Sequence, residues 1–163
     1  MMKLSCIVFL LNTLSIFAQD SESILKYVES VEGKKVGRGL CFDLVREAAE
    51  EVNRNWYKES WCDMSARNES VALEPSPGDI INFIGVVMAN GRKYPSHIGI
   101  VTKVINDSLI VIAHQNICKT SVKKKTIRYY GSKHKICSNS SVVYETMNLR
   151  QKIKGKIIYL RVR

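Results

Sequence analysis

The sequence predicts an α+β domain in which helices come first and an antiparallel sheet follows. In residues 21–32 and 40–52, apolar residues recur at spacings of three and four, which is typical of helices with one buried face. From residue 77 onward, short apolar runs rich in Ile and Val alternate with turn residues, which is typical of strands. Because the helices precede the strands, we expect a helical layer packed on an antiparallel sheet.

The first helix is predicted over 21–32, where a polar residue opens the apolar stripe and Gly33 ends it. The second follows the run Gly-Arg-Gly-Leu-Cys at 37–41 and fades near Asn53. Residues 56–77 lack either periodicity and read as irregular, and we interpret their aromatic residues mainly as packing groups.

The strands are separated by Gly, Asn and Asp turns, as expected of hairpins. His97 begins one apolar run and His114 ends the next, with an Asn-Asp-Ser turn between them. The predicted strands are 80–87, 97–104, 109–114, 126–130, 142–146 and 157–162.

The N-terminal residues predict export. Lys3 precedes an apolar run that begins at 7–11, and Ala18 closes a cleavage-like site, so we interpret 1–18 as a signal peptide and 19–163 as a single domain. The apolar run is short and interrupted for a membrane-spanning helix, which argues against stable membrane insertion. We therefore expect a secreted protein, periplasmic if the source is a Gram-negative bacterium, and a monomer.

The formal net charge of +10 favours anionic partners. No nucleic-acid motif or basic stripe with interleaved aromatic residues is present, so we expect no nucleic-acid partner. The cations gather in 119–135 and 150–163. They indicate either docking on an anionic surface such as a cell-wall polymer, or a solvated face that keeps the protein soluble.

Cys41 is the candidate nucleophile, because it lies at the start of the second helix. Unpaired N–H groups and the partial positive charge of a helix N-terminus favour a thiolate. The alternative is an ordinary core residue, since Cys41 lies on the apolar side of the helix. A base elsewhere in the sequence decides between these interpretations.

Two histidines are placed to serve Cys41. Antiparallel pairing of their strands would bring His97 and His114 to the same sheet edge, where His97 is the candidate base and His114, or Asn116 just beyond it, the residue that orients it. His134 lies in the lysine-rich segment and receives no role. No two of these groups have the spacing of metal ligands, so no metal and no cofactor are predicted.

Export permits disulfides among the remaining cysteines. If Cys41 is reserved for chemistry, the favoured pair is Cys118 with Cys137, which would close a basic hairpin-like segment, while Cys62 could replace either. The rival pattern pairs all four cysteines that follow the predicted signal peptide, including Cys41, and so removes the nucleophile.

Taken in order, four motifs resemble the NlpC/P60 and CHAP superfamily of papain-like amidases and peptidases. They are Gly-x-Gly-x-Cys at 37–41, Pro-Gly-Asp-Ile-Ile-Asn-Phe at 77–83, Ser-His-Ile-Gly-Ile-Val at 96–101 and Ile-Ala-His-Gln-Asn at 112–116. CHAP members usually carry Glu and Asn where this chain has His114 and Asn116, whereas NlpC/P60 members often use His as the third residue. Leu40 also departs from the Asp that many NlpC/P60 members have before the cysteine.

The resemblance implies a papain-like NlpC/P60 fold and a cysteine amidase or endopeptidase that hydrolyses peptidoglycan stem peptides through an acyl-enzyme. It implies that Cys41 is the nucleophile, His97 the base and His114 the third residue, and that the Cys41 backbone N–H contributes to the oxyanion hole. The chain also looks like type VI secretion amidase effectors and their secreted antibacterial relatives in animals. The alternatives are a cationic wall-binding protein without activity and a protease acting on ordinary peptides.

Overall fold

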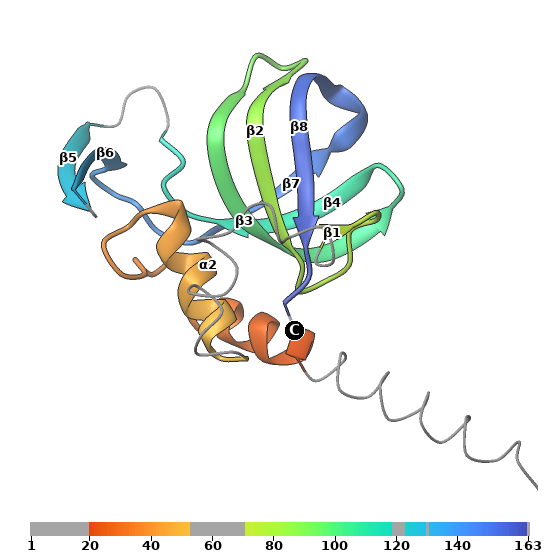
Figure 1. Ribbon diagram of the computed structural model, residues 1–163, viewed down its shortest axis with the longest axis horizontal. Coiled ribbons are helices and arrows are strands. Elements are labelled where there is room, and N and C mark those ends of the chain that lie inside the picture. The colour runs from red at the N-terminus through yellow and green to blue at the C-terminus, as the bar shows by residue number, and fades with distance from the viewer. Residues whose placement is uncertain (1–19, 53–70, 119–122, 130, 163) are drawn as a thin grey trace, which may run out of the picture.

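The computed structural model of the protein describes residues 20–52, 71–118, 123–129 and 131–162. Two helices lie together at one end of a curved antiparallel sheet, and a small two-stranded hairpin projects beside them (Figure 1). The predicted α+β class is therefore confirmed. The predicted signal peptide, Cys62 and the aromatic residues between 56 and 61 lie outside the described residues.

The helices form where the apolar spacing predicts them. The first covers residues 20–30, and the chain turns away at Gly33, which has a positive φ of 70°. The second, α2 (Cys41–Glu50), buries Leu44, Val45 and Ala48 completely. Because these residues repeat at three- and four-residue spacing, one side of α2 faces the sheet and the charged side faces water.

The main sheet has six strands in the order β1-β8-β2-β3-β4-β7, and every pairing is antiparallel. Its central strand β3 is long enough to pair with β2 through residues 93–100 and with β4 through residues 100–106. The strands are β1 (Val71–Ala72), β2 (Ile80–Met88), β3 (Lys93–Asn106), β4 (Leu109–His114), β7 (Val143–Asn148) and β8 (Lys152–Leu160).

Both faces of the sheet are apolar. Alternate residues of a strand point to opposite faces, so Ile80 and Ile100 pack with the helices while their neighbours Ile81 and Val101 join a second core on the other face. That second core is enclosed by the curl of the sheet and contains Phe83, Val86, Met88, Tyr94, Ile110, Ile112 and Met147. The strands β2 and β3 are thus fixed from both sides, which makes their ends a rigid support for a site.

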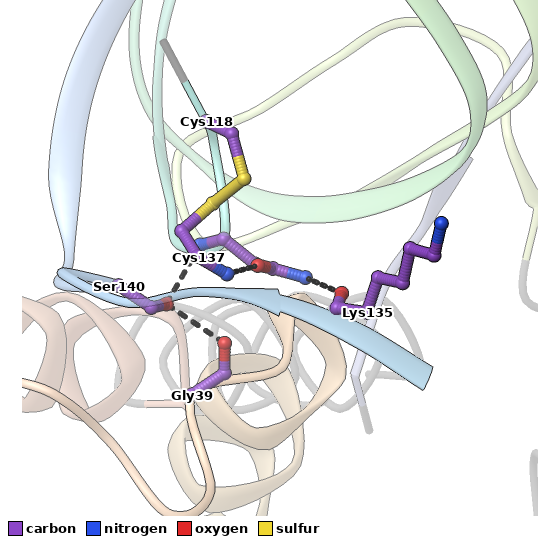
Figure 2. Close-up of a disulfide and its surroundings, with 6 residues drawn as sticks. Gly39, Cys118, Lys135, Cys137 and Ser140 are labelled. Carbon is purple, nitrogen blue, oxygen red and sulfur yellow. Dashed lines mark hydrogen bonds between the residues drawn. A yellow bond between two sulfur atoms is a disulfide. The ribbon is translucent and has the colours of Figure 1, made fainter. Parts of the chain in front are cut away.

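A separate hairpin, hereafter the arm, consists of β5 (Lys124–Tyr129) and β6 (Ser132–Cys137). A disulfide joins Cys118 to Cys137, the pairing favoured from the sequence, and so ties the base of the arm to the segment that follows β4. Beside it, the Ser140 hydroxyl donates to the carbonyl of Gly39 at 2.7 Å (Figure 2). The arm is therefore connected to the loop that precedes Cys41.

The structure differs from the predicted strands in four main places. The strand predicted from residue 97 begins at Lys93, so His97 lies inside β3 and not at its start. The last strand begins at Lys152 instead of residue 157, β6 was not predicted as a strand, and neither was the two-residue β1. The first half of β8 has no apolar run because its side chains are exposed to water, and in β6 only Ile136 and Cys137 are buried. Within the described residues, no helix is long and apolar enough to cross a membrane.

Candidate active site

Cys41 is the first residue of α2, and hydrogen bonds fix the loop that precedes it. Gly39 adopts a φ of 93°, which L side chains rarely reach, so the turn requires glycine. One carboxylate oxygen of Asp43 accepts the backbone N–H groups of Arg38 at 2.9 Å and Leu40 at 3.0 Å. Because Asp43 is itself buried, it ties the loop firmly to the first turn of α2.

Gln115 fastens the same loop to the end of β4. Its side chain is fully buried, and its amide oxygen accepts the N–H of Val36 at 3.2 Å. Its amide nitrogen donates to the carbonyl of Val36 at 3.1 Å and to that of Leu40. We call the loop of residues 36–40, which precedes Cys41, the nucleophile loop. Since Gln115 directly follows His114, it fixes the position of this loop relative to the histidine pair.

His97 on β3 and His114 at the end of β4 are brought together as the hairpin predicts. Their rings meet with Nε2 of His97 3.1 Å from Nδ1 of His114. Gly99 makes this possible, because a Cβ there would lie 2.8 Å from the carbonyl oxygen of Ala113 and 3.1 Å from Cβ of His114. The close approach leaves only Nδ1 of His97 available to a further partner.

A carboxylate that the sequence analysis did not identify lies behind the pair. Oε2 of Glu145, on β7, is 3.3 Å from Nε2 of His114, and both Glu145 oxygens lie 3.4 Å from the hydroxyl of Tyr94. Glu145 also forms an ion pair with Arg92. Within the described part of the chain, Nε2 of His114 is buried and has no hydrogen-bond partner of correct geometry. The Glu145 carboxylate lies beside it as a charged neighbour.

Cys41 and His97 both line two neighbouring clefts. One cleft, of about 490 Å³, lies between the start of α2 and the arm and is also lined by Asn82, Ser96 and His134. The other, of about 580 Å³, runs toward the turn between β2 and β3 and shares Cys41, His97 and Lys135 with the first. These volumes are in the range of small-molecule sites, and Cys41 lines both clefts.

Burial is the largest influence on the Cys41 thiol and raises its pKa above the ordinary value. The backbone N–H groups of Ile98, Phe42 and Cys41 act in the opposite direction, and the carboxylate of Asp43 adds to the rise. The backbone at the helix start thus favours the thiolate, as expected, but desolvation of the anion outweighs it and the net pKa is raised. The neutral thiol needs a base, and His97 is the histidine that lines both clefts with it.

The histidine pair is neutral in the folded protein. Burial lowers the pKa of His97 from 6.5 to about 4, and burial, with smaller effects of His97 and Arg92, lowers the pKa of His114 further. A neutral imidazole can accept the thiol proton, which a charged one cannot. The pair therefore suits a base over the neutral pH range.

The same shifts predict acid instability. Below about pH 6.5 the unfolded chain binds protons at these histidines and the folded chain does not, so unfolding becomes easier as pH falls from about 6.5 toward 4. For His97, the difference between the pKa values of the unfolded and folded chain corresponds to a decrease of about 2–3 kcal/mol in the free energy of unfolding across that pH window. Melting temperatures from pH 7 to pH 4.5 should fall less steeply for His97→Gln than for the matched control His134→Gln. Equal slopes in the two variants would contradict this reading.

Asn116, the alternative third residue, is occupied elsewhere. It adopts a positive φ of 67°, its side-chain oxygen accepts the N–H of Cys137 at 2.8 Å, and its amide nitrogen donates to the carbonyl of Lys135 at 3.2 Å. These bonds hold the base of the arm. The contact with the His97 ring is made by His114, so the geometry favours His114 as the orienting residue.

Glu145 and Gln115 were missed by sequence reasoning for different reasons. Glu145 lies on a strand 31 positions after His114 in a half-polar run with no motif, and only the β4–β7 register, which pairs it with Ile112, brings it to the site. Gln115 stands between two candidate residues, and that position was the one available signal. Within the described residues, no cluster of His, Cys, Asp or Glu has the arrangement of a metal site.

The family model of the CHAP domain matches residues 30–116, just over half of the chain. The match contains the nucleophile loop, the β3–β4 hairpin and all four motifs, and it ends at Asn116, before the arm and Glu145. Neither a curated protein nor a solved structure matches this chain. CHAP domains form a superfamily of peptidoglycan amidases and hydrolases, and the observed fold is compatible with theirs. Because the match covers more than half of the sequence and the helices and strands are arranged compatibly, the chain belongs to the CHAP domain family.

Proposed function

We propose that this protein is a secreted, antibacterial cysteine amidase that hydrolyses amide bonds in the peptide stems of peptidoglycan through a thioester on Cys41. The single observation that carries the proposal is that Cys41 and His97 line the same two clefts, while His97 is paired with the buried His114 at 3.1 Å. Family membership supports peptidoglycan as the substrate. Export is supported by the signal-like residues 1–18 and by the Cys118–Cys137 disulfide, since disulfides persist in oxidising compartments.

In the first step, Nδ1 of His97 takes the proton of the Cys41 thiol as the sulfur attacks the substrate carbonyl carbon. The carbonyl oxygen becomes an oxyanion, for which the backbone N–H of Cys41 at the start of α2 is the candidate donor. Collapse of this intermediate breaks the C–N bond, and His97 returns the proton to the leaving amine. The acyl group remains on the sulfur as a thioester.

In the second step, Nδ1 of His97 takes a proton from water as the water oxygen attacks the thioester carbon. The C–S bond breaks, the proton returns to the sulfur, and a carboxylic acid leaves. No oxidant, reductant or metal takes part in the balance. Each turnover consumes one water and produces one amine and one carboxylate.

Glu145 supports this sequence by selecting a tautomer. A carboxylate 3.3 Å from Nε2 of His114 favours the proton on that nitrogen, which leaves Nδ1 of His114 as an acceptor. Nε2–H of His97 then donates to it across 3.1 Å, and Nδ1 of His97 keeps the lone pair that the thiol needs. We assign Glu145 as a positioning residue, which acts through His114 and His97.

The experiment is an assay of new amino groups released from purified peptidoglycan. The proposal predicts a steady release of amino groups that matches the loss of intact amide bonds in the peptide stems. Binding of the protein to peptidoglycan with no release would favour a cationic wall-binding protein. Cleavage of casein together with intact peptidoglycan would instead favour a protease acting on ordinary peptides.

A further inference from the structure

We propose that the arm forms a binding site for a free carboxylate of the substrate, with Lys135 and Lys124 as its cationic ligands. The proposal rests on the proposed hydrolysis at Cys41 and adds what is recognised beside the bond that is cut. It concerns residues beyond the segment shared with the CHAP domain family, which ends at Asn116.

The charge of the two clefts carries the argument. The cleft that runs toward the β2–β3 turn is lined by four cationic side chains, from Arg92, Lys93, Lys124 and Lys135, and none of its lining residues is Asp or Glu. The cleft beneath the arm likewise has no acidic lining residue. A groove lined by one sign of charge attracts and orients a ligand group of the opposite sign.

Lys135 holds the central position, because it lines both clefts. Its side chain extends away from the disulfide, as Figure 2 shows, and is exposed. Arg92 already forms an ion pair with Glu145, whereas among the described residues neither Lys124 nor Lys135 has an acidic partner. Lys93 on β3 likewise has no acidic partner among the described residues, so Lys124 and Lys135 are the available cations that the arm contributes, beside Lys93 from the sheet.

The arm is held in place before any ligand binds. Its base is closed by the Cys118–Cys137 disulfide. Its tip is held by α2 and the preceding loop, because the Arg38 guanidinium lies 4.7 Å from the Tyr129 ring centroid and Arg46 donates to the Tyr129 hydroxyl at 3.0 Å. Fixing the arm at both ends reduces the ordering cost of binding, so lysines on it can contribute to affinity.

The position of these lysines also identifies the class of ligand. Lys135 lines both clefts with Cys41 and His97, and Lys124 lines one of them, so the anion they bind belongs to the molecule that is cut. A peptide substrate supplies such an anion as a side-chain or terminal carboxylate close to its amide bonds. A phosphate-rich wall polymer that only anchors the protein has no reason to reach the thiol, so the carboxylate of the peptide is favoured.

The test compares a synthetic stem tetrapeptide with free carboxylates and the same peptide with those carboxylates amidated. For Lys135→Gln we expect KM for the free-carboxylate peptide to rise about 5- to 20-fold with kcat within about twofold of wild type, because a charge-assisted contact is lost from binding. Lys124→Gln should give a smaller rise in the same direction. Lys154→Gln is the matched control, since Lys154 is an exposed lysine on β8 that does not line either cleft.

The amidated peptide separates charge recognition from a general disturbance of the arm. It should bind more weakly than the free peptide to wild type, and Lys135→Gln should not weaken it further. An equal rise in KM for both peptides, no rise for either, or the same rise in Lys154→Gln would overturn the proposal. A loss of binding to phosphate-rich wall polymer with unchanged kinetics on the peptide would assign the lysines to docking and overturn it as well.

Binding to Cys41→Ala protein distinguishes this proposal from the proposed hydrolysis. If wild type cleaves neither peptide, the proposed hydrolysis fails, yet affinities for the two peptides still report on the site. Tighter binding of the free-carboxylate peptide that disappears in the Cys41→Ala, Lys135→Gln double variant supports the carboxylate site on its own. Equal affinities for the two peptides reject it whether or not the enzyme is active.

Discussion

Replacing Cys41 by serine or alanine is expected to lower the rate of amide hydrolysis by a factor on the order of a thousand or more. Alanine removes the nucleophile, and serine leaves a hydroxyl whose proton the weakly basic His97 cannot readily remove. The measurement is the release of amino groups from peptidoglycan at equal protein concentration. Binding to peptidoglycan and the melting temperature should stay close to those of wild type, since serine differs from cysteine by a single atom.

The thiol itself can be followed by alkylation with iodoacetamide. Because burial raises the pKa of Cys41, alkylation of the wild-type protein is expected to be slow at neutral pH and to accelerate as pH rises. Loss of activity should follow the extent of alkylation at Cys41. Full activity in the alanine variant, or in fully alkylated protein, would show that another group performs the attack.

The second large effect is expected from Glu145→Gln, with kcat reduced about 10- to 100-fold, by analogy with other residues that orient a catalytic histidine. Glutamine keeps the size of the side chain but removes the charge that favours the proton on Nε2 of His114. If the proton moves to Nδ1 of His114, Nε2 of His97 must accept it, and Nδ1 of His97 then carries a proton and cannot serve as the base. Glu145→Asp, which keeps the charge, should recover part of the lost rate.

Tyr94→Phe is the matched control for the second prediction. It removes the hydroxyl that lies 3.4 Å from both Glu145 oxygens but keeps the carboxylate and the ring that stacks on Phe83. We expect less than about a threefold change in kcat, because the charge beside His114 remains. Nitrogen NMR shifts of His114 report its tautomer directly and should change in Glu145→Gln only. Unchanged kcat and an unchanged tautomer in Glu145→Gln would contradict the assigned role.

The elements that carry the proposed chemistry were predictable because their signals are local. Apolar periodicity places Cys41 at the start of a helix, and the turn between two apolar runs places His97 and His114 at one sheet edge. The helix signal lies within a few positions, and the two histidines are 17 positions apart in one hairpin. The Cys118–Cys137 pair was also favoured from the sequence, since it closes a short basic segment.

The features that were missed depend on distant parts of the chain. Glu145 reaches His114 only through the pairing of β4 with β7, which no local pattern encodes. The raised pKa of Cys41 depends on how deeply the helix start is buried, and that burial is supplied by the sheet. The first half of β8 was not predicted as a strand, because Lys152, Lys154 and Lys156 are exposed although their backbones pair with β2.

The most direct test of the central claim is mass spectrometry of muropeptides digested in water enriched in heavy oxygen, with wild type and the Cys41→Ala variant run side by side. Cysteine amidase chemistry predicts stem peptides cut at one kind of amide bond, with a single heavy oxygen in each new carboxylate and no products from the variant. Rapid acid quenching should also trap the acyl fragment on the peptide that contains Cys41. Intact stem peptides after digestion by wild type, or the same products from Cys41→Ala, would contradict it.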